Sequence, residues 1–127
     1  MCRKTLVMLK PDALERNLAK VIEDEIEKAG LLVSNRMTII FKETMIFDLW
    51  PDIYGEAHIQ QSIEYLAGKK LPVWLVVGED AIDSVNRIKR QLRHEYCSQR
   101  LISLFHAPDT PEEYLRACKL FLKNRTV

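Results

Sequence analysis

A histidine stands where a short apolar run ends and a helix start follows, in the stretch SLFHAPDTPEEY (103–114). A neutral imidazole is well populated near pH 7, so His106 could act as a nucleophile without a separate strong base. It could also be a metal ligand, or a polar residue that closes a strand. A histidine after a strand is by itself more often structural, so its role depends on the side chains that surround it.

A lysine ends the apolar segment near the start of the chain, KTLVMLK (4–10), which Pro11 terminates. An unpaired ammonium at the end of a buried strand is costly. The position of Lys10 therefore favours a functional role for its charge over a surface lysine whose ammonium reaches solvent. Tyr54 offers a phenolic hydroxyl, for which packing is the alternative role.

A second source of positive charge is the run NRIKRQLRHEYCSQR (86–100), with the cations Arg87, Lys89, Arg90, Arg93, His94 and Arg100. Most such runs are solvated helix faces. The functional alternatives are a clamp for a triphosphate and a patch for single-stranded nucleic acid. Because the formal net charge is only +1, nucleic acid is the less favoured partner. His94 and Cys97 are spaced for a metal, but two ligands do not make a site, so no protein metal site is predicted.

Hydrophobic spacing predicts the elements that must position these residues. Strands are predicted over four apolar stretches: 4–10, 31–41, 71–77 and 101–107. Helical spacing predicts a helix over 12–29, an interrupted helical region over 42–68, and further helices over 81–92 and 110–122. The stretch 71–77 is apolar on both faces, which is typical of a central strand. The alternation of strands and helices predicts an α/β or α+β sandwich, with helices packed against one sheet.

Helix ends and buried positions follow from residue type. Asp12 with Glu15 resembles a capping box, and Thr110, Pro111 and Glu113 form a second helix start. The buried stripe of the last helix and two core tryptophans are predicted at Leu115, Cys118, Phe121, Leu122, Trp50 and Trp74.

Length and composition fit one compact domain over residues 1–127, since 47% of the residues are hydrophobic and 29% are charged. The longest apolar run is too short to cross a membrane, and no signal peptide is evident before the first strand. The three cysteines are odd in number and widely spaced. They favour reduced thiols in a cytoplasmic protein over a disulfide framework.

Three separated stretches, TLVMLKPDALER, RQLRHEY and LFHAPDT, resemble the nucleoside diphosphate kinase family in their order along the chain. The resemblance runs from about residue 4 to residue 121. It implies an α/β (α+β) fold, a ferredoxin-like βαββαβ sandwich with additional helices, as a single domain over 1–127. It also implies transfer of the γ-phosphoryl of a nucleoside triphosphate to a nucleoside diphosphate through a phosphohistidine at His106. ATP would be the phosphoryl donor, and Mg²⁺ would arrive with the nucleotide.

The same resemblance assigns roles to individual residues. It implies that the catalytic residues are His106, Lys10 and Tyr54. It implies that the nucleotide-binding residues are Lys10, His58, Arg87, Arg93 and Ser103. Arg87 is one residue out of register with the family pattern, and Asn86 could take its place.

The chain departs from the family pattern at several positions. Pro108 replaces a serine, Ser103 replaces an asparagine, and Ala117 stands where the family has a glutamate that orients the imidazole. A loop before Arg93 is nearly absent, which predicts a dimer or monomer instead of a hexamer. These departures leave open a catalytically impaired nucleotide-binding or protein-interaction module with the same fold.

Overall fold

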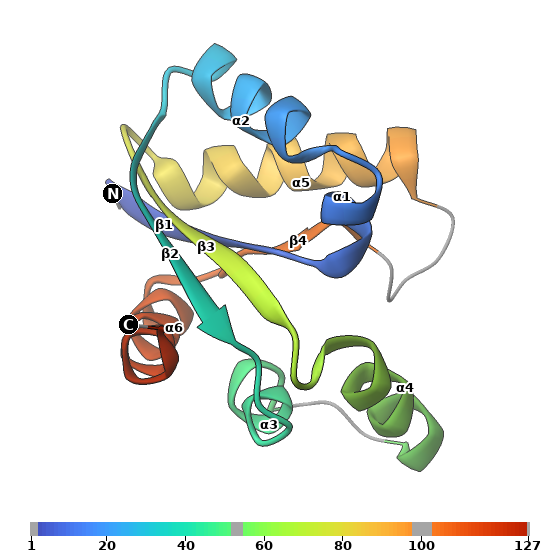
Figure 1. Ribbon diagram of the computed structural model, residues 1–127. Helices are drawn as coiled ribbons and strands as arrows, with labels where there is room; N and C mark the ends of the chain where they lie inside the picture. Colours follow the sequence, from blue (N-terminus) through green and yellow to red (C-terminus); the bar gives the residue numbers. More distant parts are fainter. Residues whose placement is uncertain (1–2, 52–54, 98–102, 127) are drawn as a thin grey trace.

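Four strands form one antiparallel sheet in the computed structural model, which describes residues 3–51, 55–97 and 103–126 (Figure 1). The strand order is β2-β3-β1-β4. The bounds are β1 Lys4–Leu9, β2 Leu32–Ile40, β3 Lys70–Val77 and β4 Phe105–His106. This order, with helices between β1 and β2 and between β3 and β4, confirms the predicted ferredoxin-like βαββαβ sandwich.

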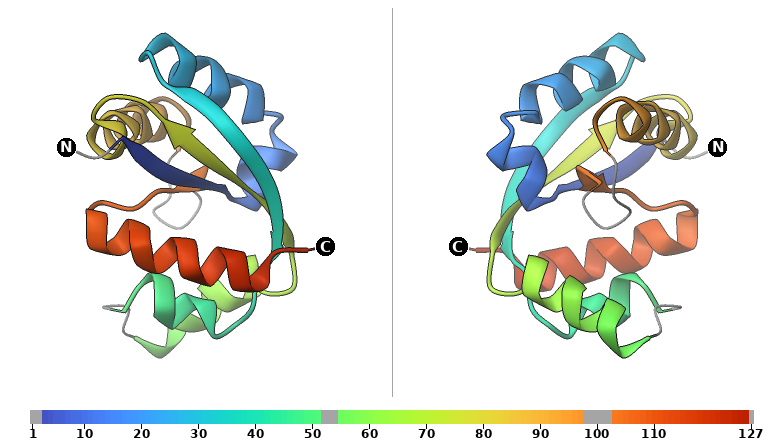
Figure 2. Two further views of the ribbon diagram at one scale, coloured as in Figure 1. Left: turned by 90° about the vertical axis from the view of Figure 1, so that its left-hand side faces the viewer. Right: turned by 90° about the vertical axis from the view of Figure 1, so that its right-hand side faces the viewer.

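Helices cover both faces of the sheet, and their bounds are α1 Pro11–Glu15, α2 Ala19–Lys28, α3 Met45–Leu49, α4 Glu56–Leu66, α5 Ala81–Tyr96 and α6 Pro111–Asn124. Successive residues of β1 point to opposite faces of the sheet. Val7 and Leu9 therefore join the core under α2 and α5, whereas Leu6 and Met8 join the core under α3, α4 and α6. Figure 2 shows α6 on the side of the sheet opposite α2 and α5. None of the described helices is long and apolar enough to cross a membrane.

The helix predicted over 12–29 is divided in two, because Asn17 takes a left-handed conformation with φ of 57° between α1 and α2. The predicted capping box at Asp12 is wrong. Lys10 is the residue that precedes α1, and the Asp12 carboxylate accepts hydrogen bonds from the Tyr65 hydroxyl and the Leu104 N–H instead. These partners are distant in the sequence, so a local pattern could not predict that the Asp12 carboxylate binds them and does not cap the helix.

The last helix begins as predicted, with Thr110 Oγ1 accepting from the Glu113 N–H at 3.1 Å. Its buried face agrees with the prediction at two of four positions, since Phe121 is buried and Cys118 packs against the core. The prediction is wrong for Leu115, which is 60% exposed, and Leu122, which is 51% exposed, whereas Ala117 is buried. The spacing of four residues between Ala117 and Phe121 defines the stripe that meets the sheet, and both leucines fall beside it.

Candidate active site

His106 ends β4, pairs with Met8 of β1 and is half-buried. The chain reaches it through Leu104, whose φ of 71° lies in the left-handed region that side chains other than glycine rarely adopt. Two hydrogen bonds hold this conformation. Asp12 Oδ2 accepts from the Leu104 N–H at 3.0 Å, and the Leu104 carbonyl accepts from the Lys10 N–H at 2.8 Å. The strained backbone is thus fixed from the start of α1, two residues before the imidazole.

Lys10 directly follows β1 and is only 6% exposed. Its Nζ donates to Ser103 Oγ at 3.0 Å. Burial, and next the charge of Arg93, lower the pKa of Lys10 from 10.5 to about 8. The ammonium is therefore still mainly protonated near pH 7, and it supplies positive charge in a partly desolvated place.

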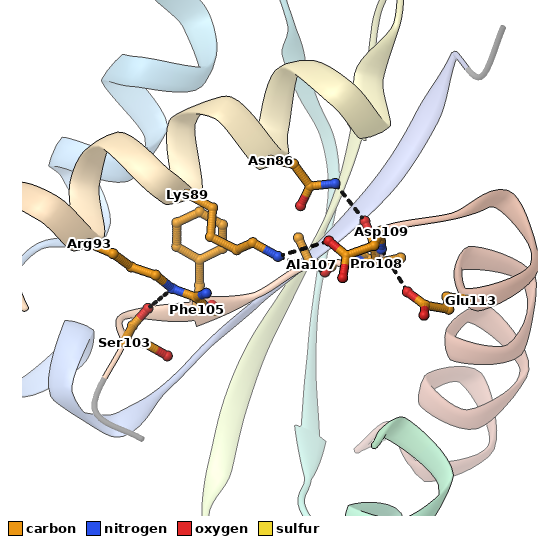
Figure 3. A network of polar contacts seen from close by, with 9 residues as sticks. All are labelled: Asn86, Lys89, Arg93, Ser103, Phe105, Ala107, Pro108, Asp109 and Glu113. Carbon is orange, nitrogen blue, oxygen red and sulfur yellow. Dashed lines mark hydrogen bonds and ion pairs between the residues drawn. The ribbon is translucent and has the colours of Figure 1, made fainter. Parts of the chain in front are cut away.

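Helix α5 contributes side chains from one face, at positions 86, 89 and 93, toward the segment that carries His106 (Figure 3). Arg93 makes the shortest of these contacts. Its Nε donates to the Ser103 carbonyl at 3.1 Å and its Nη2 donates to the Phe105 carbonyl at 2.9 Å. The planar guanidinium can hold two acceptors at fixed separation, which an ammonium cannot.

Two further side chains on the same face of α5 contact the residues that follow His106. Lys89 Nζ donates to the Ala107 carbonyl and contacts the Asp109 carboxylate, both at 3.3 Å. Asn86 Nδ2 donates to the Pro108 carbonyl at 3.2 Å. Because β4 is only two residues long, the sheet cannot satisfy these carbonyl groups, and α5 side chains do so. Hydrogen bonds from α5 therefore hold the residues on both sides of His106.

The electrostatic surroundings of His106 keep its imidazole neutral. Burial, followed by the charges of Lys10, Lys89 and Arg93, lowers the pKa of His106 from 6.5 to about 3. We call these three residues the cation cluster. A neutral ring has a lone pair available for attack, and an anion placed beside it would meet three positive charges.

The other recorded neighbour of the imidazole is aromatic. Trp50, which follows α3, has its ring 5.1 Å from the His106 ring between centroids, in an edge-to-face arrangement at 74°. The sequence predicted Trp50 as a core residue, but it is half-buried and stands beside the candidate nucleophile.

The predicted site residues fall into two groups. Lys10, Arg93 and Ser103 are linked by the hydrogen bonds above and lie next to His106. The two others that are described are exposed and have no recorded contact with the cation cluster. His58 lies in the first turn of α4, and Arg87 on α5 donates to Ser84 Oγ at 3.3 Å. Tyr54 lies outside the described residues.

Sequence analysis missed Lys89 as a member of the site. Its spacing, three residues after Asn86 and four before Arg93, places it on the inner face of α5 and could have identified it. The role of Asp12 could not be found in this way, because Leu104 is 92 residues away in the sequence.

The described residues provide no cage for a metal ion, since no group of three or more His, Cys, Asp or Glu side chains is placed to hold one. Carboxylates near the site have other partners. Glu113 Oε2 accepts from the Asp109 N–H at 2.8 Å, and the charged groups recorded as acting on the imidazole are all cations. Ala117 is buried in the core under α6.

Comparison with known proteins gives one consistent result. The family model described as nucleoside diphosphate kinase matches residues 3–127. A nucleoside diphosphate kinase of Sulfurisphaera tokodaii is 23% identical over 95% of this chain and 89% of its own length. One of Methanocaldococcus jannaschii is 26% identical over 97% of this chain and 95% of its own length.

Solved structures agree on the fold. A crystal structure of the Aquifex aeolicus nucleoside diphosphate kinase superposes with a TM-score of 0.78 at 22% identity, covering 94% of each chain. The enzyme from Encephalitozoon cuniculi superposes with a TM-score of 0.80 at 21% identity, covering 95% of this chain and 89% of its own. At this level of identity the superpositions establish the architecture alone.

Proposed function

Because the chain belongs to the nucleoside diphosphate kinase family, we propose that it moves the γ-phosphoryl of a nucleoside triphosphate to a nucleoside diphosphate by way of His106. One observation carries the proposal. The imidazole is neutral and half-buried, and the charged side chains that act on it are the three members of the cation cluster. This is an arrangement suited to a nucleophile that receives an anionic group.

In the proposed reaction a ring nitrogen of His106 attacks the γ-phosphorus. A phosphorus–nitrogen bond forms, and the bond from the γ-phosphorus to the oxygen it shares with the β-phosphate breaks. The nucleoside diphosphate leaves with that electron pair. A second diphosphate then attacks the phosphohistidine and the same bonds exchange in reverse. No base is needed for the first step, because the attacking nitrogen carries no proton.

The cation cluster serves as the charge stabiliser. Negative charge spreads over the transferred oxygens as the group moves, and fixed cations in a partly dry site stabilise it strongly. Mg²⁺ enters as part of the nucleotide substrate, held by phosphate oxygens. The remaining predicted ligands stay part of the proposal: Tyr54 as a catalytic hydroxyl, with His58, Arg87 and Ser103 as nucleotide contacts.

The decisive experiment is phosphorylation with ATP labelled on its γ-phosphate, in the presence of Mg²⁺. We expect an acid-labile protein label that passes to an added nucleoside diphosphate. His106→Gln should abolish the label. His94→Gln is the matched control, because His94 is an exposed histidine on α5. Label that persists in His106→Gln would remove His106 from the role, and an unlabelled native protein would refute phosphoryl transfer.

A second candidate function is a nucleotide-binding module that keeps the fold without the chemistry. It is favoured by the absence of a carboxylate among the described charged groups acting on the imidazole. This candidate predicts that ATP raises the melting temperature of the protein while no phosphate is exchanged. Efficient exchange between ATP and a second diphosphate would eliminate it.

The proposal includes a dimer or monomer as the working form. Helix α5 runs unbroken from Ala81 to Tyr96 and already contains Arg93, which supports the predicted loss of the loop before that arginine. Sedimentation equilibrium at several concentrations tests this, and a hexamer would contradict it.

A further inference from the structure

The Trp50 indole contacts both the His106 ring and the Lys10 ammonium. Its indole packs edge-to-face on the His106 ring, with 5.1 Å between centroids, and Lys10 Nζ lies over the indole at 5.6 Å from its centroid. Ring pairs at this separation and angle are attractive, and an ammonium over an indole face is attracted by the negative face of the ring. One side chain therefore contacts both the proposed nucleophile and a buried cation.

The residue that carries the indole is itself anchored. The backbone N–H of Trp50 donates to the Ile46 carbonyl at 2.9 Å, at the end of α3. On its other side the ring packs near Phe41, with 6.4 Å between centroids. Phe41 is fully buried in the core under α3 and α4. The position of the indole is consequently set by the core and does not depend on a bound ligand.

The imidazole has few other restraints. Among the described residues no hydrogen bond to the His106 ring is recorded, and the charged groups that face it are Lys10, Lys89 and Arg93. All three are cations, so none accepts a hydrogen bond from the ring N–H. An imidazole without such a partner can turn about its terminal bond, where the torsional wells are broad. The contact with Trp50 is the recorded interaction that opposes this rotation.

We propose that Trp50 is a positioning residue, which holds the His106 ring in one orientation and keeps the Lys10 ammonium beside it, in place of an acidic partner of the imidazole. For catalysis this inference rests on the proposed phosphoryl transfer, but the orientation of the ring can be tested without it.

The test compares Trp50→Leu, Trp50→Phe and a control, Phe47→Leu, by NMR of the histidine rings. Phe47 is an aromatic residue of α3, the helix that Trp50 follows, and it is 50% exposed. His106→Gln assigns the His106 signals among the three histidines. In the native protein the ring protons of His106 should be displaced from their unfolded positions by the indole ring current. Trp50→Leu should remove the displacement and Phe47→Leu should keep it.

A pH titration of the same signals provides a second readout. Removing the indole admits water to a ring whose other neighbours are the cation cluster, so the pKa of His106 should rise in Trp50→Leu. Unchanged ring signals together with an unchanged pKa in Trp50→Leu would overturn the proposal. Equal changes in Phe47→Leu would also overturn it, since they would reflect α3 as a whole.

The rate of phosphorylation by ATP gives the catalytic readout. We expect Trp50→Leu to be about tenfold slower and Trp50→Phe to stay within about threefold, because phenylalanine preserves an aromatic contact. If the native protein takes no label, phosphoryl transfer fails and the NMR result still decides the positioning role. If Trp50→Leu does not fold, Trp50→Phe decides. Its weaker ring current should move the His106 signals part of the way to their unfolded positions, and unmoved signals would refute the inference.

Discussion

Both faces of α5 carry cationic side chains, which are buried or half-buried on the inner face and exposed on the outer face. Lys89 is 8% exposed and reaches the His106 segment, while its neighbour Arg90 is exposed. Arg93 is half-buried and holds two carbonyl groups, whereas Arg87 is exposed and its recorded bond within the described part of the chain is to Ser84 of the same helix.

The difference shows that burial decides what a cation on this helix does. On the inner face, desolvation lowers the pKa of Lys89 and of Arg93, which is the cost of withdrawing their charge from water. Hydrogen bonds to the His106 segment offset that cost, and the retained charge acts on the imidazole. On the outer face water screens the charge, so little effect on the site remains.

The largest contrast is expected between neighbouring residues in the rate of phosphoryl transfer. Lys89→Met should reduce the rate of His106 phosphorylation by ATP about a hundredfold, because it removes a buried charge from the cation cluster. Arg90→Met should stay within about threefold, since Arg90 is exposed. Quenched-flow labelling with γ-labelled ATP measures both. Equal losses would show that the inner face has no special electrostatic role.

A comparable contrast is expected in stability. Arg93→Met should lower the free energy of unfolding by about 3 kcal/mol, because the Ser103 and Phe105 carbonyls both lose a charged donor. Arg90→Met should change the free energy of unfolding by less than about 0.5 kcal/mol. Urea unfolding of both variants measures this, and a mild effect for Arg93→Met would mean that the carbonyls find water instead.

The response to acid follows from the lowered pKa of His106. Because the folded value of about 3 lies below the ordinary 6.5, the unfolded chain takes up this proton first as the pH falls. The stability linked to His106 is therefore lost between about pH 6.5 and pH 3. At pH 5 the loss relative to pH 7 should be on the order of 2 kcal/mol.

His106→Gln isolates that contribution, because it lacks the titrating ring. Urea unfolding at pH 7 and pH 5 should show a steeper loss for the native protein than for the variant. Parallel pH dependence in the two proteins would show that the ring is accessible to protons in the folded state.

The smallest effect is expected at Asn86, which completes the inner face. Its Nδ2 bonds to the Pro108 carbonyl, whereas its Oδ1 is buried without a recorded partner. Asn86→Leu removes a favourable bond and an unsatisfied acceptor together. The free energy of unfolding should consequently change by less than about 1 kcal/mol. A loss of several kcal/mol in thermal or urea unfolding would indicate that the oxygen has an additional partner in solution.

The sequence predicted the fold well because the relevant signals are local. The apolar strand before Pro11, the apolar stretch at 71–77 and the helix start at Thr110 each follow from neighbouring residues, and each is present. Local reasoning was wrong where a distant group intervened. Asp12 meets the conditions for a cap in sequence, yet its carboxylate bonds to Tyr65 and Leu104.

For the site, the position of Lys10 at the end of an apolar strand indicated a functional cation, and the resemblance to the family predicted His106 as the nucleophile with Lys10 and Arg93 beside it. The tertiary structure identified the third cation, Lys89, for which the sequence offers helical spacing alone, and the aromatic neighbour, Trp50. The reason is physical. Burial and ring contacts depend on which elements pack together, and side chains from α5 and from the end of α3 meet at His106 only in the folded chain.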